Sequence, residues 1–249
     1  KNKAAQLGIV LTDEIAAYAR AMAETGDELT FHDKQVFDFH SFGGLPGNKI
    51  TPIVVSIVAA AGLTIPKLSS RAISSACGTA DFVETFCRVD LDADEVRRIS
   101  EETGGVFSWT GATDLGPAGD HFITVQRPLG IDPRPQLLAS IMSKKVAVGA
   151  TDLVMDIPMG SESKVPTLED AKAYARDLMD LGDKLGIRVE CAITYAKQPL
   201  GEAVGPILEA RECMEVLERV PGHEDVIDKA CICAGTILSM GGVRDGVGK

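Results

Sequence analysis

Aromatic residues are scarce in this 249-residue chain, making up 5% of it, and Trp109 is the single tryptophan. The core must therefore be largely aliphatic. No apolar stretch is long enough to span a bilayer, since the longest one, residues 53–63, is interrupted by Ser56. The six cysteines form no Cys-x-x-Cys motif and no paired zinc spacing. This pattern predicts reduced thiols in a cytoplasmic protein and no metal site.

Acidic residues outnumber basic ones by 36 to 25, so the net charge is −11. A field of that sign disfavours binding to nucleic acid or to an anionic membrane. Two stretches depart from this balance. Residues 41–80 contain three basic side chains and no acid, and residues 121–151 contain four basic side chains and one acid, Asp132. The distribution predicts that small anionic ligands are bound locally.

Short apolar segments alternate with helical patterns along most of the chain. Such alternation predicts an α/β fold, a mainly parallel sheet with flanking helices. Strands are expected at residues 35–40, 106–109, 122–126, 153–157 and 187–195. A helix starting at Asp132 follows a stretch rich in Gly and Pro, so it is expected to join the N-terminal helix in a small all-helical lobe. The predicted division assigns residues 1–30 and 120–150 to the lobe, and residues 31–119 and 151–249 to the α/β domain, with a cleft between them.

Three loops that lead from predicted strands into helices are rich in Gly, Ser and basic residues. Residues 41–51 contain three glycines and Lys49, residues 69–79 place five hydroxyl side chains around Arg71, and residues 160–164 end in Lys164. Backbone N–H groups at helix N-termini bind anions, and glycine lets a phosphate approach the main chain. Each loop could be an ordinary turn, but three in one domain predict phosphate binding. The pattern matches neither Walker A nor the dinucleotide motif.

Several residues near these loops have a functional and a purely structural interpretation. His40 either donates a hydrogen bond to a substrate or phosphate oxygen, or is satisfied within its turn. Asp132 is either a helix N-cap or a general acid. These two roles conflict, because an N-cap and nearby arginines lower a carboxyl pKa whereas a proton donor needs it raised. Ser140 and Lys144 share one helix face, which points either into the cleft or, for Lys144, into solvent.

Four segments resemble the thymidine and pyrimidine-nucleoside phosphorylase family: residues 40–44, 69–79, 137–145 and 153–161. Within this family, residues 70–81 (SRAISSACGTAD) and 131–140 (IDPRPQLLAS) are most similar to the archaeal AMP phosphorylase branch. The resemblance implies a nucleoside phosphorylase/phosphoribosyltransferase-like fold. It also implies phosphorolysis of a nucleoside 5′-monophosphate (AMP, and also CMP and UMP) to free base and ribose 1,5-bisphosphate. Inorganic phosphate would be the co-substrate, with no other cofactor, and the enzyme would be a homo-oligomer.

The resemblance also implies individual roles. Asp132 would be the proton donor. Nucleotide contacts would fall on Gly44, Ser70, Arg71, Ala72, Ile73, Ser74, Ser75, Thr79, Ser140 and Lys164. Contacts to phosphate or base are assigned less specifically to His40, Ser41, Lys49, Ser69, Arg127 and Lys144. Bacterial members have lysine where this chain has Phe39. Another basic side chain must therefore supply the positive charge near the phosphate, and Lys49 and Arg71 are the candidates.

Members of the family are longer at both ends, so the chain is expected to be truncated. Two dianions, a 5′-phosphate and an attacking phosphate, require at least two anion sites, which agrees with the loops. Three alternatives stay open: a phosphorylase of unphosphorylated pyrimidine nucleosides, a non-catalytic nucleotide-binding module, and a phosphoribosyltransferase. The last would need magnesium and a carboxylate near the glycine-rich loop, and residues 41–51 contain no carboxylate.

Overall fold

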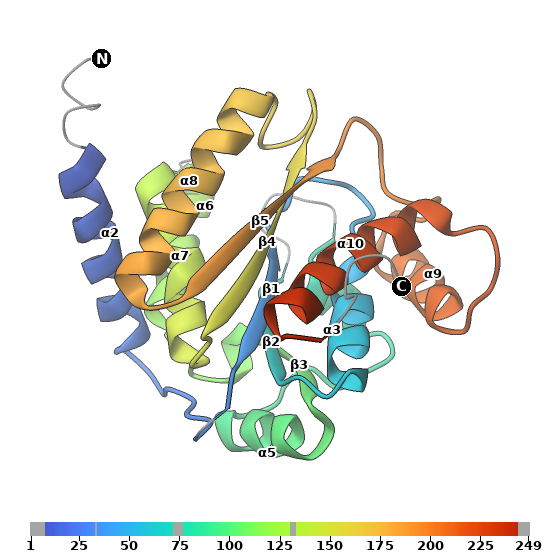
Figure 1. Ribbon diagram of the computed structural model, residues 1–249, viewed down its shortest axis with the longest axis horizontal. Coiled ribbons are helices and arrows are strands. Elements are labelled where there is room, and N and C mark those ends of the chain that lie inside the picture. The colour runs from blue at the N-terminus through green and yellow to red at the C-terminus, as the bar shows by residue number, and fades with distance from the viewer. Residues whose placement is uncertain (1–7, 33, 72–76, 130–132, 244–249) are drawn as a thin grey trace.

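The computed structural model describes residues 8–32, 34–71, 77–129 and 133–243. Strands and helices alternate along this part of the chain (Figure 1). The strands are β1 (Phe37–Ser41), β2 (Ile65–Ser69), β3 (Gly105–Trp109), β4 (Asp152–Met159) and β5 (Arg188–Tyr195). Their pairings are all parallel, which confirms the predicted α/β class.

The sheet pairs β1, β4 and β5 in that order, and β2 pairs separately with β3. A bridge between Val36 and Thr64 joins the two groups of strands, and Phe37 N donates to Thr64 O at 2.8 Å. Strand register places His40 opposite Met155 and Ser41 opposite Asp156. Because the strands are parallel, β1, β2 and β4 all end on the same edge, where α/β proteins bind ligands.

Helices cover both faces of the sheet (Figure 1). On one face lie α3 (Ile50–Ala60), α9 (Pro206–Leu217) and α10 (Glu224–Met240); on the other lie α2 (Gly8–Ala23), α7 (Arg134–Ala147) and α8 (Leu168–Leu185). Of the remaining elements, α4 (Thr79–Val83) contacts α9, α5 (Ala93–Thr103) contacts β2 and β3, and α6 (Ala118–Leu129) contacts α2, while η1 (Thr110–Ala112) directly follows β3. Along β4, Val154 packs into the α3 and α10 layer, whereas Leu153 and Met155 pack into the α2, α7 and α8 layer. This central strand is therefore buried on both sides.

Helix boundaries follow the local sequence. Asp92 caps α5 by accepting a hydrogen bond from Glu95 N, and Thr167 caps α8 by accepting one from Asp170 N. Both helices end at a glycine in the left-handed conformation, Gly104 and Gly186. None of the described helices is long and apolar enough to cross a membrane.

The strand predicted at residues 122–126 is wrong, because these residues lie within α6. β-branched and aromatic side chains favour strands locally, but that preference depends strongly on packing. Here Phe122 packs edge-on against Tyr18 of α2, with 5.7 Å between ring centroids. Packing of α6 against α2 therefore stabilises a helix where the local sequence favours a strand.

Helix α2 packs against α7, and it also contacts α6 and α8. Ala16 and Met22 of α2 share one hydrophobic cluster with Leu138 of α7 and with Met155 of β4. These helices therefore pack directly on the sheet as well as on each other. The four-segment division into lobe and α/β domain stays a prediction.

Truncating Met155 should destabilise the protein, since this side chain is fully buried between β4 and the helices. We expect Met155→Ala to lower the free energy of unfolding by about 2–5 kcal/mol, through lost burial and the cavity left behind. The matched control is Met179→Ala on α8, where the side chain is exposed and the change should stay below about 0.5 kcal/mol. Chemical denaturation of both variants measures the free energy of unfolding. An equal decrease in the two variants would contradict the described core.

Candidate active site

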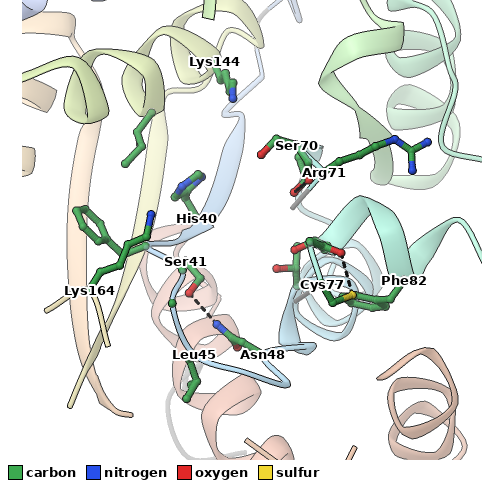
Figure 2. Close-up of a pocket in the computed structure, with 18 of the residues that line it drawn as sticks. His40, Ser41, Leu45, Asn48, Ser70, Arg71, Cys77, Phe82, Lys144 and Lys164 are labelled. Carbon is green, nitrogen blue, oxygen red and sulfur yellow. Dashed lines mark hydrogen bonds between the residues drawn. The ribbon is translucent and has the colours of Figure 1, made fainter. Parts of the chain in front are cut away.

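A pocket opens at the carboxyl ends of β1 and β2, between the loops that follow these strands and helix α7 (Figure 2). Several predicted residues line it: His40, Ser41, Gly44, Ser69, Ser70, Arg71, Thr79, Ser140, Lys144 and Lys164. They come from β1, β2 and the segments that follow them, from α4 and α7, and from the loop after β4. The tertiary structure thus brings together segments far apart in the sequence.

The glycine loop, residues 42–49 between β1 and α3, forms one wall of the pocket. Gly43 and Gly44 have φ values of +80° and +85°, which side-chain-bearing residues rarely adopt. At Gly44 a Cβ atom would also lie 3.0 Å from Cγ of Lys164. Glycine at this position therefore allows the loop to approach the segment that carries Lys164.

Ser41 is oriented by a buried carboxylate. Its Oγ donates to Asp156 Oδ2 at 2.8 Å and accepts a hydrogen bond from Asn48 Nδ2 at 2.8 Å (Figure 2 shows the latter contact). Asp156 is fully buried, accepts a hydrogen bond from Thr194 and lies 2.9 Å from Nζ of Lys229. The Ser41 proton is thus directed at Asp156, so in this arrangement Ser41 fixes the start of the glycine loop.

Positive charge surrounds His40 at the end of β1. Figure 2 shows Lys144 and Lys164 on the same side of the pocket as His40. Burial lowers the pKa of His40 well below its usual value, and the ammonium groups of Lys145, Lys67, Lys144 and Lys164 lower it further. His40 is therefore a neutral imidazole at pH 7, able to donate a hydrogen bond without adding charge.

A buried charge cluster lies behind His40. Asp38 of β1 lies 2.5 Å from Lys145 Nζ and 3.5 Å from Lys67 Nζ, and all three side chains are buried. Two lysines face one carboxylate, so the cluster carries an excess positive charge when Lys67 is protonated. Burial lowers the pKa of Lys67 to about 7, with Asp38 opposing the shift. The interior beneath the pocket therefore favours anions.

Arg71 lines the pocket, but its guanidinium points away from His40 and Lys164 (Figure 2). It makes a bidentate pair with Glu84 at 2.7 and 2.8 Å and lies 4.6 Å from the centre of the Trp109 ring. Hydrogen bonding to Glu84 raises its pKa above the usual value. The charge of Arg71 is therefore already compensated.

The assignment of Lys49 to phosphate or base needs correction. Its side chain is completely buried behind the glycine loop, and it does not line the pocket. Nζ donates to Glu212 Oε2 at 2.5 Å and to Leu200 O at 2.8 Å. This ammonium group is thus paired with a buried carboxylate and does not face the pocket.

Some predicted residues cannot be placed. Ala72, Ile73, Ser74, Ser75 and Asp132 lie outside the described residues. The backbone of Arg127 belongs to α6, and its side chain is outside the description. Their roles stay predictions.

Sequence reasoning missed a carboxylate in the pocket wall. Glu209 of α9 is buried, lines the pocket and accepts a hydrogen bond from Gly205 N at 3.0 Å. Burial raises its pKa above the usual value. Its sequence position, 160 residues beyond the end of the glycine loop, contains no signal for this placement. Asp38 and Lys67 were also missed, although a charged residue within an apolar strand is a signal in itself.

Potential metal ligands are scattered through the described part of the chain. In residues 8–32, 34–71, 77–129 and 133–243, no three His, Cys, Asp or Glu side chains are grouped so as to hold a metal ion.

The comparison with protein families identifies the domain. Residues 33–246 match the family described as "Glycosyl transferase family, a/b domain". The chain belongs to this glycosyl transferase family. The match runs from just before β1 to the end of α10, so it includes every strand described above and the loops that line the pocket.

Among curated proteins, the AMP phosphorylase of Thermococcus kodakarensis is 54% identical over 238 residues, covering 95% of this chain and 47% of the relative. The AMP phosphorylase of Methanosarcina acetivorans is 53% identical over 230 residues, covering 92% of this chain and 46% of the relative. The chain thus spans about half the length of these relatives.

Among solved structures, anthranilate phosphoribosyltransferase from Thermus thermophilus superimposes with a TM-score of 0.75 at 22% identity. The alignment covers 94% of this chain and 77% of that structure. At this identity the likeness shows the fold alone, and it confirms the predicted phosphoribosyltransferase-like architecture.

The buried Lys67 makes stability pH-dependent. In the unfolded chain its pKa is near 10.5, whereas in the folded protein it is about 7, so between these values the unfolded state binds more protons. Stability should therefore rise with pH across this window, by about 1 kcal/mol per pH unit. We expect the free energy of unfolding of the wild type relative to Lys67→Met to increase from pH 7 to pH 10. Lys34→Met, at an exposed lysine, is the control, for which the difference in free energy of unfolding from the wild type should not change with pH. A difference between the wild type and Lys67→Met that stays constant from pH 7 to pH 10 would contradict the lowered pKa of Lys67.

Proposed function

We propose that the protein is a phosphorylase of nucleoside 5′-monophosphates, with AMP as a substrate. One observation carries the proposal: the glycine loop, the loop after β2 and Lys164 meet in one pocket with His40 and Lys144. Two anionic groups can be held there at once, as this reaction requires. The relatives named AMP phosphorylase support the choice of substrate.

In the proposed reaction an oxygen of inorganic phosphate attacks C1′ of the ribose as the C1′–N bond breaks. The electron pair of that bond goes to the base nitrogen, and Asp132 donates a proton to the base. The attacking hydrogen phosphate loses a proton overall, so the products are neutral base and ribose 1,5-bisphosphate. Holding the phosphate beneath C1′ makes the attack effectively intramolecular. This is how positioning of the phosphate lowers the activation barrier.

Residues of the pocket would share this work. Backbone N–H groups of the glycine loop and the N-terminus of α3 favour a phosphate, and the ammonium groups around His40 add an attractive field. Neutral His40 would donate a hydrogen bond to a phosphate or substrate oxygen. Lys164 and the loop after β2 would bind the 5′-phosphate, and Ser140 and Lys144 of α7 would face the nucleotide.

Inorganic phosphate is the only small molecule besides the nucleotide that the proposed reaction needs. We also propose that the protein is a homo-oligomeric, cytoplasmic enzyme and that it binds neither nucleic acid nor membranes.

Base release from AMP, CMP and UMP, with and without phosphate, tests the reaction in the intact protein. We expect free base only when phosphate is present, together with ribose 1,5-bisphosphate, both resolved by chromatography. Base release at equal rates without phosphate would identify a hydrolase instead. Equal turnover of uridine and UMP would favour the pyrimidine-nucleoside alternative.

Asp132→Asn tests the proton donor. An amide cannot supply the proton, so we expect kcat to fall by about 10²-fold or more while AMP binding changes little. Asp120→Asn, in the preceding α6 helix, is a control that removes an equal charge from a residue without an assigned role. Unchanged turnover in Asp132→Asn would refute the assignment.

Lys164→Met tests recognition of the 5′-phosphate. Losing one ammonium contact should raise the KM for AMP by about tenfold or more, and alter kcat/KM for adenosine far less. Lys197→Met, at an exposed lysine, is the control. An equal loss of kcat/KM for AMP and for adenosine would show that Lys164 does not recognise the 5′-phosphate.

A further inference from the structure

Lys49 and Glu212 form a buried ion pair that lies beside the pocket without lining it. The Lys49 side chain is 0% exposed and that of Glu212 is 4% exposed. Glu212 of α9 also accepts hydrogen bonds from Glu202 N and Ala203 N, both at 3.0 Å. Lys49 Nζ donates in addition to Leu200 O. The pair therefore joins the glycine loop, the loop 200–203 and α9 at one point.

Stability alone does not account for this pair. Lys49 is the N-cap of α3, where the helix dipole disfavours a cation. Burying an ammonium and a carboxylate carries a desolvation penalty that hydrophobic residues of similar size would avoid. Uncharged side chains at both positions, such as methionine at 49 and glutamine at 212, would occupy a similar volume without these costs. The fixed geometry that the pair imposes on the loops is what a methionine could not supply.

That geometry extends to the pocket. Leu200 N donates to Pro46 O at 3.0 Å, so the glycine loop is also tied to loop 200–203 through its main chain. At Gly47 a Cβ atom would lie 2.5 Å from Leu200 O, which shows how closely the two loops approach. Gly43 and Gly44, four and three residues before Gly47, form the pocket wall. Moving Lys49 away from Glu212 would therefore displace that wall.

We propose that Lys49 is a positioning residue, which acts through Glu212 to hold the glycine loop in its anion-binding conformation and so sets the affinity of the pocket for inorganic phosphate. This inference rests on the proposed function for its substrate. Lys49 acts through the loop and not by contact, because its ammonium is buried against Glu212 and Leu200 O and does not line the pocket.

Steady-state kinetics of Lys49→Met in the intact protein test the proposal. We expect the KM for phosphate to rise at least tenfold, while kcat changes less than threefold, because the reacting groups remain in place. Glu212 keeps its two backbone donors in this variant, so the protein should still fold. The control is Arg188→Met, which removes an ion pair with Asp152 at the opposite end of the sheet and should leave the KM for phosphate unchanged.

A second pair of variants separates positioning from general stability. Glu212→Gln removes the negative charge that compensates the buried Lys49 ammonium and leaves it only neutral oxygen acceptors, such as Leu200 O and the new amide oxygen. The thermal midpoint should therefore drop more than in Lys49→Met. The double variant Lys49→Met/Glu212→Gln buries no unpaired ammonium and should regain thermal stability. Its KM for phosphate should nevertheless stay at least tenfold raised. A double variant with both stability and KM restored would overturn the proposal, as would a wild-type KM in Lys49→Met.

Failure of the proposed function would look different. If the wild type shows no phosphate-dependent base release, the reaction assignment fails. Titration calorimetry with inorganic phosphate then tests the ion pair directly, with weaker binding expected in Lys49→Met and in the double variant. Equal phosphate affinity in the wild type and both variants would overturn the positioning role of Lys49.

Discussion

Three buried carboxylates hold positive charge around the carboxyl ends of β1 and β2, and the pocket depends on them. Asp38 pairs with Lys145 and Lys67, Asp156 with Lys229, and Glu212 with Lys49. An ammonium group left alone in the interior would lose its proton or destabilise the fold. Paired as they are, these lysines can lie inside the protein next to a ligand site.

Each carboxylate has a different effect on the pocket. Asp38 holds two lysines behind His40; burial lowers the pKa of the imidazole, and the field of these lysines lowers it further while it attracts anions. Asp156 orients Ser41, and Glu212 ties the glycine loop to its neighbour. A chain with a net charge of −11 can thereby present a positive site, because charge separation within the fold matters more than the total.

Prediction from the sequence succeeded where local chemistry and position in the chain suffice. The parallel strands were expected from periodicity, and the glycine loop after β1 was expected from residue type. Prediction failed where the decisive partner is remote. Lys49 looked like a phosphate ligand because it follows a glycine loop, but its partner Glu212 is 163 residues later. No local pattern indicates whether such a lysine points into a pocket or behind it.

Residue order alone therefore determined the fold class, the loops rich in glycine and basic residues, and the family resemblance. These features depend on backbone conformation and on side chains a few residues apart. Only the tertiary structure decided which lysines line the pocket, that Glu209 joins the pocket wall and that residues 122–126 are helical. Burial and long-range pairing determine these outcomes, because desolvation energy depends on what surrounds a charge in space and not on its neighbours along the chain.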